Sequence, residues 1–299
     1  EPSKELFSND FTKICKIIIE ERDADSGKTS KTLLQKDAQG WQLPDVYGFH
    51  AAEKQINQML TSIRDLKRGY PTSTTAGAAE HFKLSKDNFE KAVHMFDGQE
   101  KETVLYLSAT PRFRSSYAKT SESNDIYNIE FSPFQINGKA SDWIDRNAVD
   151  LQVATIASVD LGNFQLKKSG QKWNLQTGEK SKQLHDSVAR PLLDAVTRIP
   201  INSVLGTTPE PSFGTQSPVL TCTVTLNDGK SRSYTFFKAK DKAYSVLKIS
   251  DKPWYLAVDD VVVNRIKNST AASIDKSEEL EAEKTKGQNQ GGAAVTKAK

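Results

Sequence analysis

The sequence predicts an α+β protein built by tandem duplication of one module. Each module is expected to be a mostly antiparallel β-sheet in the order β-β-α-β-β-β-β, with one helix packed on the sheet. Three observations predict this fold: residues that recur at a nearly constant offset, two amphipathic helical stripes, and alternating strand segments. At 299 residues, each half is long enough to bury its own core.

The recurring residues begin at a tryptophan, since Trp41 matches Trp173 at an offset of 132. The further pairs are Ile56 and Val188, Leu60 and Leu192, and Ile63 and Ala195 at 132; Phe82 and Phe213, and Asp97-Gly98 and Asp228-Gly229, at 131; and Ile126-Tyr127 and Trp254-Tyr255 at 128. An offset that drifts by only four residues over nearly a hundred favours a duplication.

The order of elements is expected to be the same in both modules. An apolar strand at 14–20 is followed by a long hairpin tip at 23–31 and the Gly40-Trp41 corner, and the second copy leads from Phe164 to Trp173. Helices are expected at about 50–67 and 182–199. At an offset of 132, Pro191 falls on Met59, and an interior proline costs ~3 kcal/mol, so the second helix is expected to kink or to start late.

A long loop follows each helix, at 68–81 and 201–212, and leads to Phe82 or Phe213. Loops of this length are functional or are packed by their own side chains, so both are candidate contact surfaces. A hairpin then turns at Asn227-Asp228-Gly229, and a further strand pair at 244–249 and 254–258 matches 116–120 and 126–131.

These patterns divide the chain into four parts. We expect residues 1–11 to form a tether, 12–150 the first module, 151–267 the second module, and 268–299 a flexible C-terminal tail. The tail is rich in Glu, Lys, Gln, Gly and Ala, and only 278–286 is a candidate for a fraying helix.

Composition argues against two classes of partner. The 41 Lys and Arg residues are interspersed with 38 Asp and Glu residues, which does not give the basic face of a nucleic-acid-binding protein. Mean hydropathy is -0.58, and no apolar run approaches the ~18 residues that a membrane-spanning helix needs.

No catalytic residue, metal site or cofactor is predicted, and the ligand-binding residues are unknown. The four histidines, His50, His81, His94 and His185, form no HExxH pattern, and no nucleophile elbow or phosphate-binding glycine loop is present. The acidic pairs Asp23/Asp25 and Asp259-Asp260 lack the pattern of a calcium loop.

The two cysteines and two of the tryptophans are expected to have structural roles. Cys15 and Cys222 are expected to be free buried thiols rather than a disulfide. Trp41 and Trp173 are expected to anchor each hairpin against its helix. If a sugar or peptide stacks on this protein, Trp143 and the two long loops are the expected place.

Several short segments together resemble a known bacterial family over roughly residues 12–266. The segments are Ile14–Glu20, Gly40-Trp41, Phe82-Lys83-Leu84, Asp97-Gly98 and, most specifically, Asp142-Trp143-Ile144-Asp145-Arg146. The chain is similar to the "domain of unknown function 4340" proteins. It departs from them at Lys83, where a glycine is common, and at Pro191, which interrupts the second helix.

The resemblance implies a periplasmic, extracytoplasmic protein that is held to the inner membrane by an N-terminal helix, which this chain lacks. It also implies an ABC-type permease of the gliding-motility-like class as partner. We therefore expect a non-enzymatic binding or scaffold module of such a transporter. Two alternatives remain open: a secreted structural or adhesive protein that self-associates, and a carbohydrate-active enzyme, whose paired carboxylates leave no sequence spacing.

Overall fold

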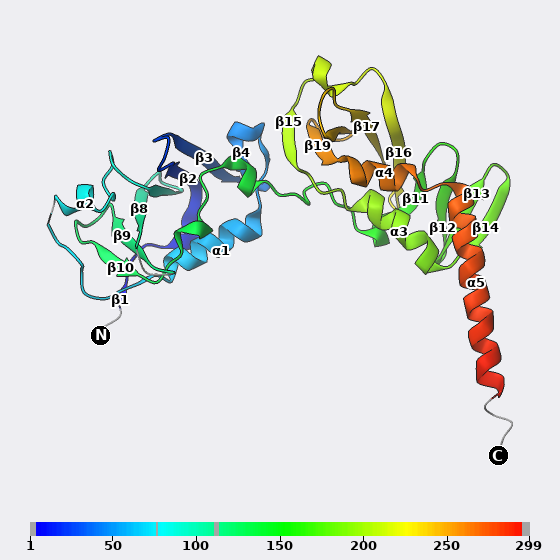
Figure 1. Cartoon of the computed structure of the whole chain (residues 1–299), viewed down its shortest axis with the longest axis horizontal. Helices are drawn as coiled ribbons and strands as arrows, with labels where there is room; N and C mark the ends of the chain where they lie inside the picture. Colours follow the sequence, from blue (N-terminus) through cyan, green and yellow to red (C-terminus); the bar gives the residue numbers. More distant parts are fainter. Residues whose placement is uncertain (1–3, 76, 111–113, 295–299) are drawn as a thin grey trace. The chain divides into compact units, whose positions relative to one another are not determined.

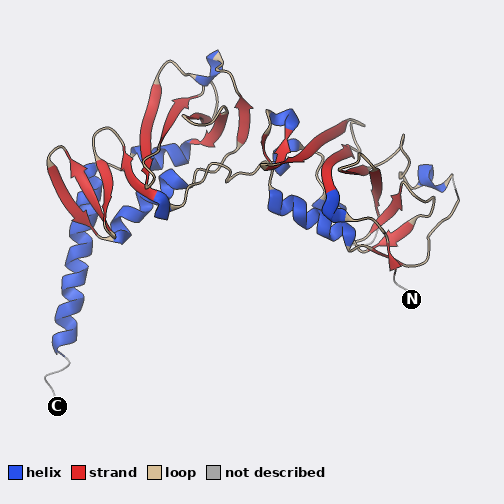
Figure 2. Ribbon diagram, turned by 180° about the vertical axis from the view of Figure 1, so that it is seen from behind, coloured by secondary structure: helices blue, strands red, loops and turns tan. Residues whose placement is uncertain are grey.

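The computed structural model describes residues 4–75, 77–110 and 114–294. The chain divides into two compact units, residues 1–145 and 146–299. In each unit one long helix, α1 (Glu53–Arg64) or α3 (Asp186–Thr197), lies along one side of an antiparallel sheet (Figures 1 and 2). The predicted α+β class is therefore confirmed.

Unit 1 contains an eight-stranded antiparallel sheet in the order β10-β9-β8-β7-β2-β3-β4-β5. Helix α1 (Glu53–Arg64) buries one stripe against this sheet, and α2 (Ala78–His81) is a single turn. The strands are β2 (Ile14–Arg22), β3 (Thr29–Asp37), β4 (Gly40–Leu43), β5 (Phe49–His50), β7 (Lys91–Asp97), β8 (Glu102–Ala109), β9 (Ser116–Thr120) and β10 (Tyr127–Ile129), and β1 (Lys4–Glu5) pairs separately with β6 (Lys67–Arg68).

Unit 2 contains a nine-stranded sheet in the order β14-β13-β12-β11-β16-β17-β18-β19-β15. Its helices are α3 (Asp186–Thr197), α4 (Asp260–Lys267) and α5 (Ala271–Ala294). The strands are β11 (Ile156–Asp160), β12 (Gln165–Ser169), β13 (Lys172–Thr177), β14 (Lys180–Leu184), β15 (Ser203–Gly206), β16 (Pro218–Leu226), β17 (Ser231–Lys238), β18 (Tyr244–Ile249) and β19 (Tyr255–Asp259).

The two units share one strand order. Read from β19 to β14, the sheet of unit 2 repeats the order of unit 1 from β10 to β5, with β15 added at the β19 edge. The register also repeats, because Lys36 lies opposite Trp41 in unit 1 and Lys168 lies opposite Trp173 in unit 2. Both pairs keep the offset of 132, as a duplication predicts.

The helices, however, align at 133 rather than 132. The buried positions Ile56, Met59, Leu60 and Ile63 of α1 correspond at 133 to Ala189, Leu192, Leu193 and Val196 of α3, all buried. The extra residue lies in the turn before the helix: five residues separate Leu43 from Phe49, and six separate Leu175 from Lys182.

This shift corrects the placement of Pro191. At 133 it corresponds to Gln58, which is exposed, rather than to the buried Met59. Helix α3 begins at Asp186, four residues after the expected start at 182, and runs through Pro191 to Thr197. The proline ring therefore lies on the solvent side of α3, where it takes no core position.

The predicted number of strands and helices per module was wrong in two respects. Two strands were expected before the helix, whereas the main sheet of each unit has four strands there, and in unit 1 the separate strand β1 also precedes α1. The additional sheet strands were missed because β5 has only two residues and because four of the five residues of β14 are exposed, so neither shows an apolar alternation. The modules also have helices beyond the one expected in each, the single turn α2 in unit 1 and α4 in unit 2, while α5 includes the stretch 278–286 that was a candidate helix.

The N-terminal segment is not a tether over the residues that the structure describes. Lys4 and Glu5 pair with Arg68 and Lys67, and the side chains of Leu6 and Phe7 are buried. These two apolar side chains give the segment enough surface to pack on unit 1. Residues 1–3 of the expected tether lie outside the described residues.

The expected flexible tail is largely the helix α5, and its first turns are attached to unit 2. Ile274 is buried, and the Glu278 carboxylate accepts a hydrogen bond from the His185 backbone N–H at 2.8 Å and contacts His185 Nδ1 at 2.5 Å. Lys182 Nζ lies 2.8 Å from Asp275 Oδ1. Residues 295–299 of the expected tail lie outside the described residues.

The segment 142–146 ends one unit and begins the next. Trp143 is fully buried, its Nε1 donates to the carbonyl of Asn137 at 2.8 Å, and its own carbonyl accepts from the Ala52 N–H at 2.7 Å. Arg146 accepts from the Ile201 N–H at 3.0 Å and donates to the Ile201 carbonyl at 3.1 Å. The boundary therefore falls after Asp145 rather than after the expected residue 150.

The long loops pack on the second face of each sheet. In unit 1, Leu84 is buried against Ala92, Val104, Tyr106 and Ile126. In unit 2, Phe213 is buried against Phe237, Ala239 and Val246. Each loop is thus anchored by an apolar side chain over one part of the sheet.

The residue after each loop aromatic has a left-handed backbone in both units. Lys83 has φ 55° and Gly214 has φ 68°. A Cβ at Gly214 would lie 2.3 Å from the carbonyl oxygen of Lys238, so glycine is required there for space as well as for conformation.

We predict that Gly214→Ala destabilises unit 2 more than Gly178→Ala does. Gly178 also has positive φ, but a Cβ there would meet nothing within 4 Å, so its substitution costs only the left-handed strain of about 1–2 kcal/mol. The contact with Lys238 adds a further cost of roughly 1–3 kcal/mol. Urea denaturation of both variants measures the difference, and equal midpoints would contradict the close approach.

Candidate functional site

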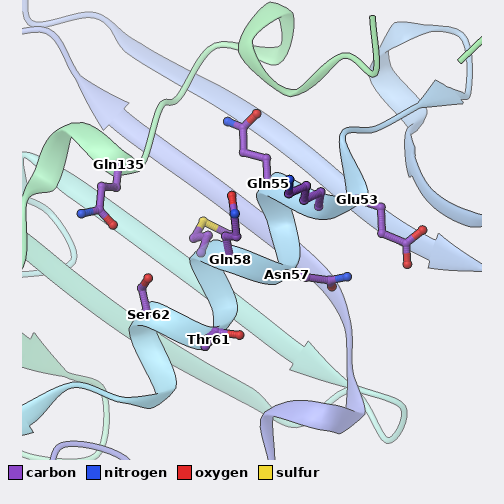
Figure 3. A pocket seen from close by; sticks show the side chains of 9 residues that line it. Glu53, Gln55, Asn57, Gln58, Thr61, Ser62 and Gln135 are labelled. Carbon is purple, nitrogen blue, oxygen red and sulfur yellow. The ribbon is translucent and has the colours of Figure 1, made fainter. Parts of the chain in front are cut away.

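The candidate site is a hollow of about 1010 Å³ along the outer side of α1. Gln55, Gln58 and Ser62 lie on the side of α1 that faces Gln135, which belongs to the 3-10 turn η3 (Pro133–Gln135) (Figure 3). The complete lining is Glu53, Lys54, Gln55, Asn57, Gln58, Met59, Thr61, Ser62 and Gln135.

The lining consists mainly of neutral amide and hydroxyl groups. Charges occur only at Glu53 and Lys54, at the start of α1. The side chains of Gln55, Gln58 and Gln135 make no hydrogen bond to another described residue, so their donors and acceptors face solvent. Such a surface can bind a peptide backbone, a glycan or a polar protein face.

The same side of α3 has a different chemistry. At the offset of 133, Val188, Pro191 and Ala195 stand where α1 has Gln55, Gln58 and Ser62. Helices α4 and α5 pack against α3, and Ala195 is buried while Ser62 is only half-buried. In the described part of unit 1, no α-helix follows β10, so α1 lacks the cover that α3 has.

The loop that carries Gln135 is fixed to the sheet by an ion pair between the buried Lys91 and the half-buried Glu21. Lys91 Nζ lies 2.9 Å from Glu21 and donates to the Ile136 carbonyl at 2.5 Å. Burial opposes ionisation of Glu21, but the Gly138 N–H and Lys91 outweigh it and hold the pKa of Glu21 below its ordinary value. The neighbouring Phe134 is 84% exposed, which leaves an aromatic side chain beside the hollow.

None of the four histidines lines this hollow. His94 lies between Glu20, 3.3 Å from Nε2, and Glu102, 2.7 Å from Nδ1. His185 contacts Glu278, His81 lies edge-on to Phe82, and His50 is on β5. Among the described residues, no three His, Cys, Asp or Glu side chains are grouped to hold a metal ion.

The acidic pairs have local structural roles. Asp23 accepts the backbone and side-chain hydrogen bonds of Ser26, which lower the pKa of Asp23. Asp259 caps α4 by accepting the Val261 N–H at 2.8 Å. Partial burial opposes ionisation of Asp260, but Lys238 and Ser245 donate to it and hold the pKa of the Asp260 carboxyl below its ordinary value. Within the described ranges, Glu278 is the one buried carboxylic acid.

Two of the tryptophans have the structural role that was predicted for them, and the prediction for a third was wrong. Trp41 and Trp173 are 2% and 6% exposed, which agrees with the predicted anchoring role. Trp143 was expected to be available for stacking, but it is 0% exposed. Its indole is needed where the chain leaves unit 1, and the nearby exposed aromatic is Phe134 instead.

The outer side of α1 was not identified from the sequence, because neutral polar side chains on a helix are read as solvated. A signal was nevertheless present. No charged residue occurs from Gln55 to Ile63, although 26% of the chain is charged. The stretch becomes a candidate binding surface once it is known that α3 packs against α4 and α5 while α1 has no such neighbours in the described part of unit 1.

A family model described as "Domain of unknown function (DUF4340)" matches residues 41–218, or 178 of the 299 residues. The chain belongs to this family. The DUF4340 match begins at Trp41 and ends at Pro218, the first residue of β16, so it takes in parts of both units. No curated protein and no solved structure matches the chain.

In the part of this DUF4340 chain that the structure describes, no helix combines the length and the apolar character of a membrane span.

Both cysteines are free thiols, as predicted. Cys222 lies buried on β16, and this burial raises the pKa of the Cys222 thiol to about 12. Cys15 on β2 is half-buried, with its Sγ 3.8 Å from the Phe96 carbonyl.

We predict that Cys222 resists thiol reagents at pH 8 until unit 2 unfolds, because the reactive thiolate is a minute fraction of a thiol with this pKa. The measurement is maleimide labelling of a Cys15→Ser variant, followed by mass spectrometry. Slow labelling in buffer and rapid labelling in urea are expected. Labelling of the folded variant as fast as of a free cysteine peptide would contradict the burial.

Proposed function

We propose that this protein is a non-enzymatic, extracytoplasmic binding or scaffold module, held at the inner membrane, that serves as an accessory component of an ABC-type transport system. The observation that carries the proposal is the open, uncharged side of α1, which no further α-helix in the described part of unit 1 covers, whereas α3 packs against α4 and α5. Membership of the DUF4340 family supports the proposal, since the resemblance implies a permease as partner.

The chemistry of this side of α1 suits a contact with a protein. Amide and hydroxyl groups cost less to remove from water than charged groups do, and the cores of protein interfaces are depleted in Lys and Glu. Met59 lines the hollow, and the exposed Phe134 stands next to Gln135. Aromatic and methionine side chains are enriched at interfaces, so these two supply apolar anchors within a neutral polar surface.

The length of α1 suits a contact with one helix or segment of a partner protein. A helix of 12 residues is ~18 Å long, close to the length that one segment of a partner covers in a helix-in-groove contact. We therefore place the extracytoplasmic face of the permease against α1 and η3. Unit 2, whose equivalent helix is covered by its own chain, then serves as support.

We predict that Gln58→Arg reduces recovery of the permease with the anchored full-length protein by about tenfold or more. A buried unpaired charge at the centre of an interface costs more than the 1.4 kcal/mol that a tenfold change in affinity requires. The measurement is quantitative pull-down from solubilised membranes. The matched control is Asn124→Arg, which changes an exposed amide in the turn between β9 and β10.

Three outcomes have distinct meanings. Loss of the permease with Gln58→Arg but not with Asn124→Arg supports the proposal. Equal recovery of the permease with both variants would show that the contact does not involve the outer side of α1. Repeated failure of the unsubstituted protein to recover any membrane protein, together with self-association in light scattering, contradicts the transporter role and favours the adhesive alternative.

A further inference from the structure

Unit 2 contains a second pocket that this proposed function does not use. It has a volume of about 340 Å³ and is lined by residues of the 3-10 turn η5 (Val153–Thr155), strands β12 and β13, and helix α3. The lining is Asp150, Leu151, Gln152, Val153, Ala154, Lys168, Trp173, Arg190 and Arg198. The volume falls in the range of small-molecule sites, roughly 300–1,000 Å³.

Three cations line this pocket. Lys168 projects from β12, Arg190 from α3, and Arg198 follows the last residue of α3. Arg190 uses Nε to contact both carboxylate oxygens of Asp194 at 3.1 Å, and its terminal nitrogens have no partner among the described residues. With Asp150 as the one acid of the lining and Asp194 paired to Arg190 just outside it, three positive and two negative charges leave a formal balance of +1.

Two of the cations lack a structural explanation. The side chains of Lys168 and Arg198 make no hydrogen bond or ion pair with another residue that the structure describes. Arg198 gains some stabilisation from the end of α3, where the helix dipole favours a positive charge. Lys168, in the middle of a strand, has no such dipole, and it faces two like charges across the pocket.

The first copy provides an internal comparison. Unit 1 has a pocket of about 260 Å³ at the equivalent place, where Lys36 and Trp41 correspond to Lys168 and Trp173. Asn57 stands there in place of Arg190 at the offset of 133.

The same comparison holds at the helix end. At the offset of 133, Asp65 stands in unit 1 where unit 2 has Arg198. The arginine of the first pocket, Arg64, is paired with this Asp65 at 2.7 Å. The two pockets therefore share a scaffold, while only the second has three cations among the described residues.

We propose that the pocket beside Trp173 binds the phosphate group of a small phosphomonoester. A phosphomonoester carries about −1.5 to −2 charges at neutral pH and three acceptor oxygens, so one phosphate group can contact both Lys168 and Arg198. Arginine guanidinium groups bind phosphate oxygens in pairs, and lysine adds a point charge. The wall formed by Trp173 and Val153 contacts the organic part of the ester.

The test is isothermal titration calorimetry of the whole chain at fixed ionic strength. The probes are inorganic phosphate and glycerol 3-phosphate, with acetate as the carboxylate control. Lys168→Gln and Arg198→Gln are expected to raise the dissociation constant of glycerol 3-phosphate by about tenfold each. The matched controls Lys36→Gln and Arg64→Gln, at the pocket of unit 1, are expected to leave it within twofold.

A phosphate ester also occurs in lipid headgroups, and a second arm separates the two sources. Co-sedimentation uses phosphatidylcholine vesicles with and without phosphatidic acid. Binding of glycerol 3-phosphate without vesicle binding assigns a soluble ester, whereas vesicle binding that Arg198→Gln abolishes assigns a headgroup. Both outcomes support the phosphate site.

Other results would overturn the proposal. These are no heat with 10-fold excess of either phosphate probe at millimolar protein, equal affinity for acetate and phosphate, or equal effects of the variants in the two units. Thermal unfolding of each variant tests whether it is folded. If Lys168→Gln does not fold, the result for Arg198→Gln decides, because Arg198 is exposed and its substitution disturbs packing less. Since the test variants Lys168→Gln and Arg198→Gln lie in unit 2 and the permease is absent, failure here leaves the proposed function untouched.

Discussion

In each unit, a tryptophan buried at a hairpin corner determines where the helix crosses the sheet. The indoles of Trp41 and Trp173 are 2% and 6% exposed, and each lies opposite a lysine on the neighbouring strand. The Trp41 carbonyl also accepts the Ala51 N–H at 2.9 Å, two residues before α1 begins. A side chain of this size buries roughly 150–250 Å², so the corner contributes strongly to each core. The strands around this corner follow the same order in both units.

One scaffold therefore presents two different surfaces. In unit 2, α4 and α5 pack on α3, and the apolar Val188 and Ala195 replace the amide and hydroxyl groups of α1. In unit 1, the corresponding side of α1 is neutral, polar and open. At the pockets beside the tryptophans, it is the second copy that has the more basic residues: Arg190 and Arg198 stand where the first copy has Asn57 and Asp65. Duplication followed by such local changes gives separate binding surfaces without a new fold.

The sequence predicted the elements that depend on strong periodic signals. The tryptophan offset, the helical stripes and the α+β class were recovered, because burial imposes them directly on residue type. The offset of the helices was wrong by one, since a stripe with spacings of three and four still overlaps itself after a shift of one residue, as Leu60 with Leu192 shows. The exposed strand β14 and helix α5 carry few apolar residues, so tertiary pairing determines them. The candidate site on α1 was missed because it is recognised only by comparing the contacts of α1 with those of α3, which packs against α4 and α5.

The most direct test of the central claim is hydrogen exchange measured unit by unit in Trp41→Ala and Trp173→Ala variants. Each substitution removes a buried indole, so we expect the unit that carries it to lose about 3–5 kcal/mol of stability while the other keeps its protection. Comparable losses at the two sites would show that the tryptophans have the same role. Losses below about 0.5 kcal/mol, the size of an ordinary surface substitution, or a large loss in one unit alone, would contradict the account.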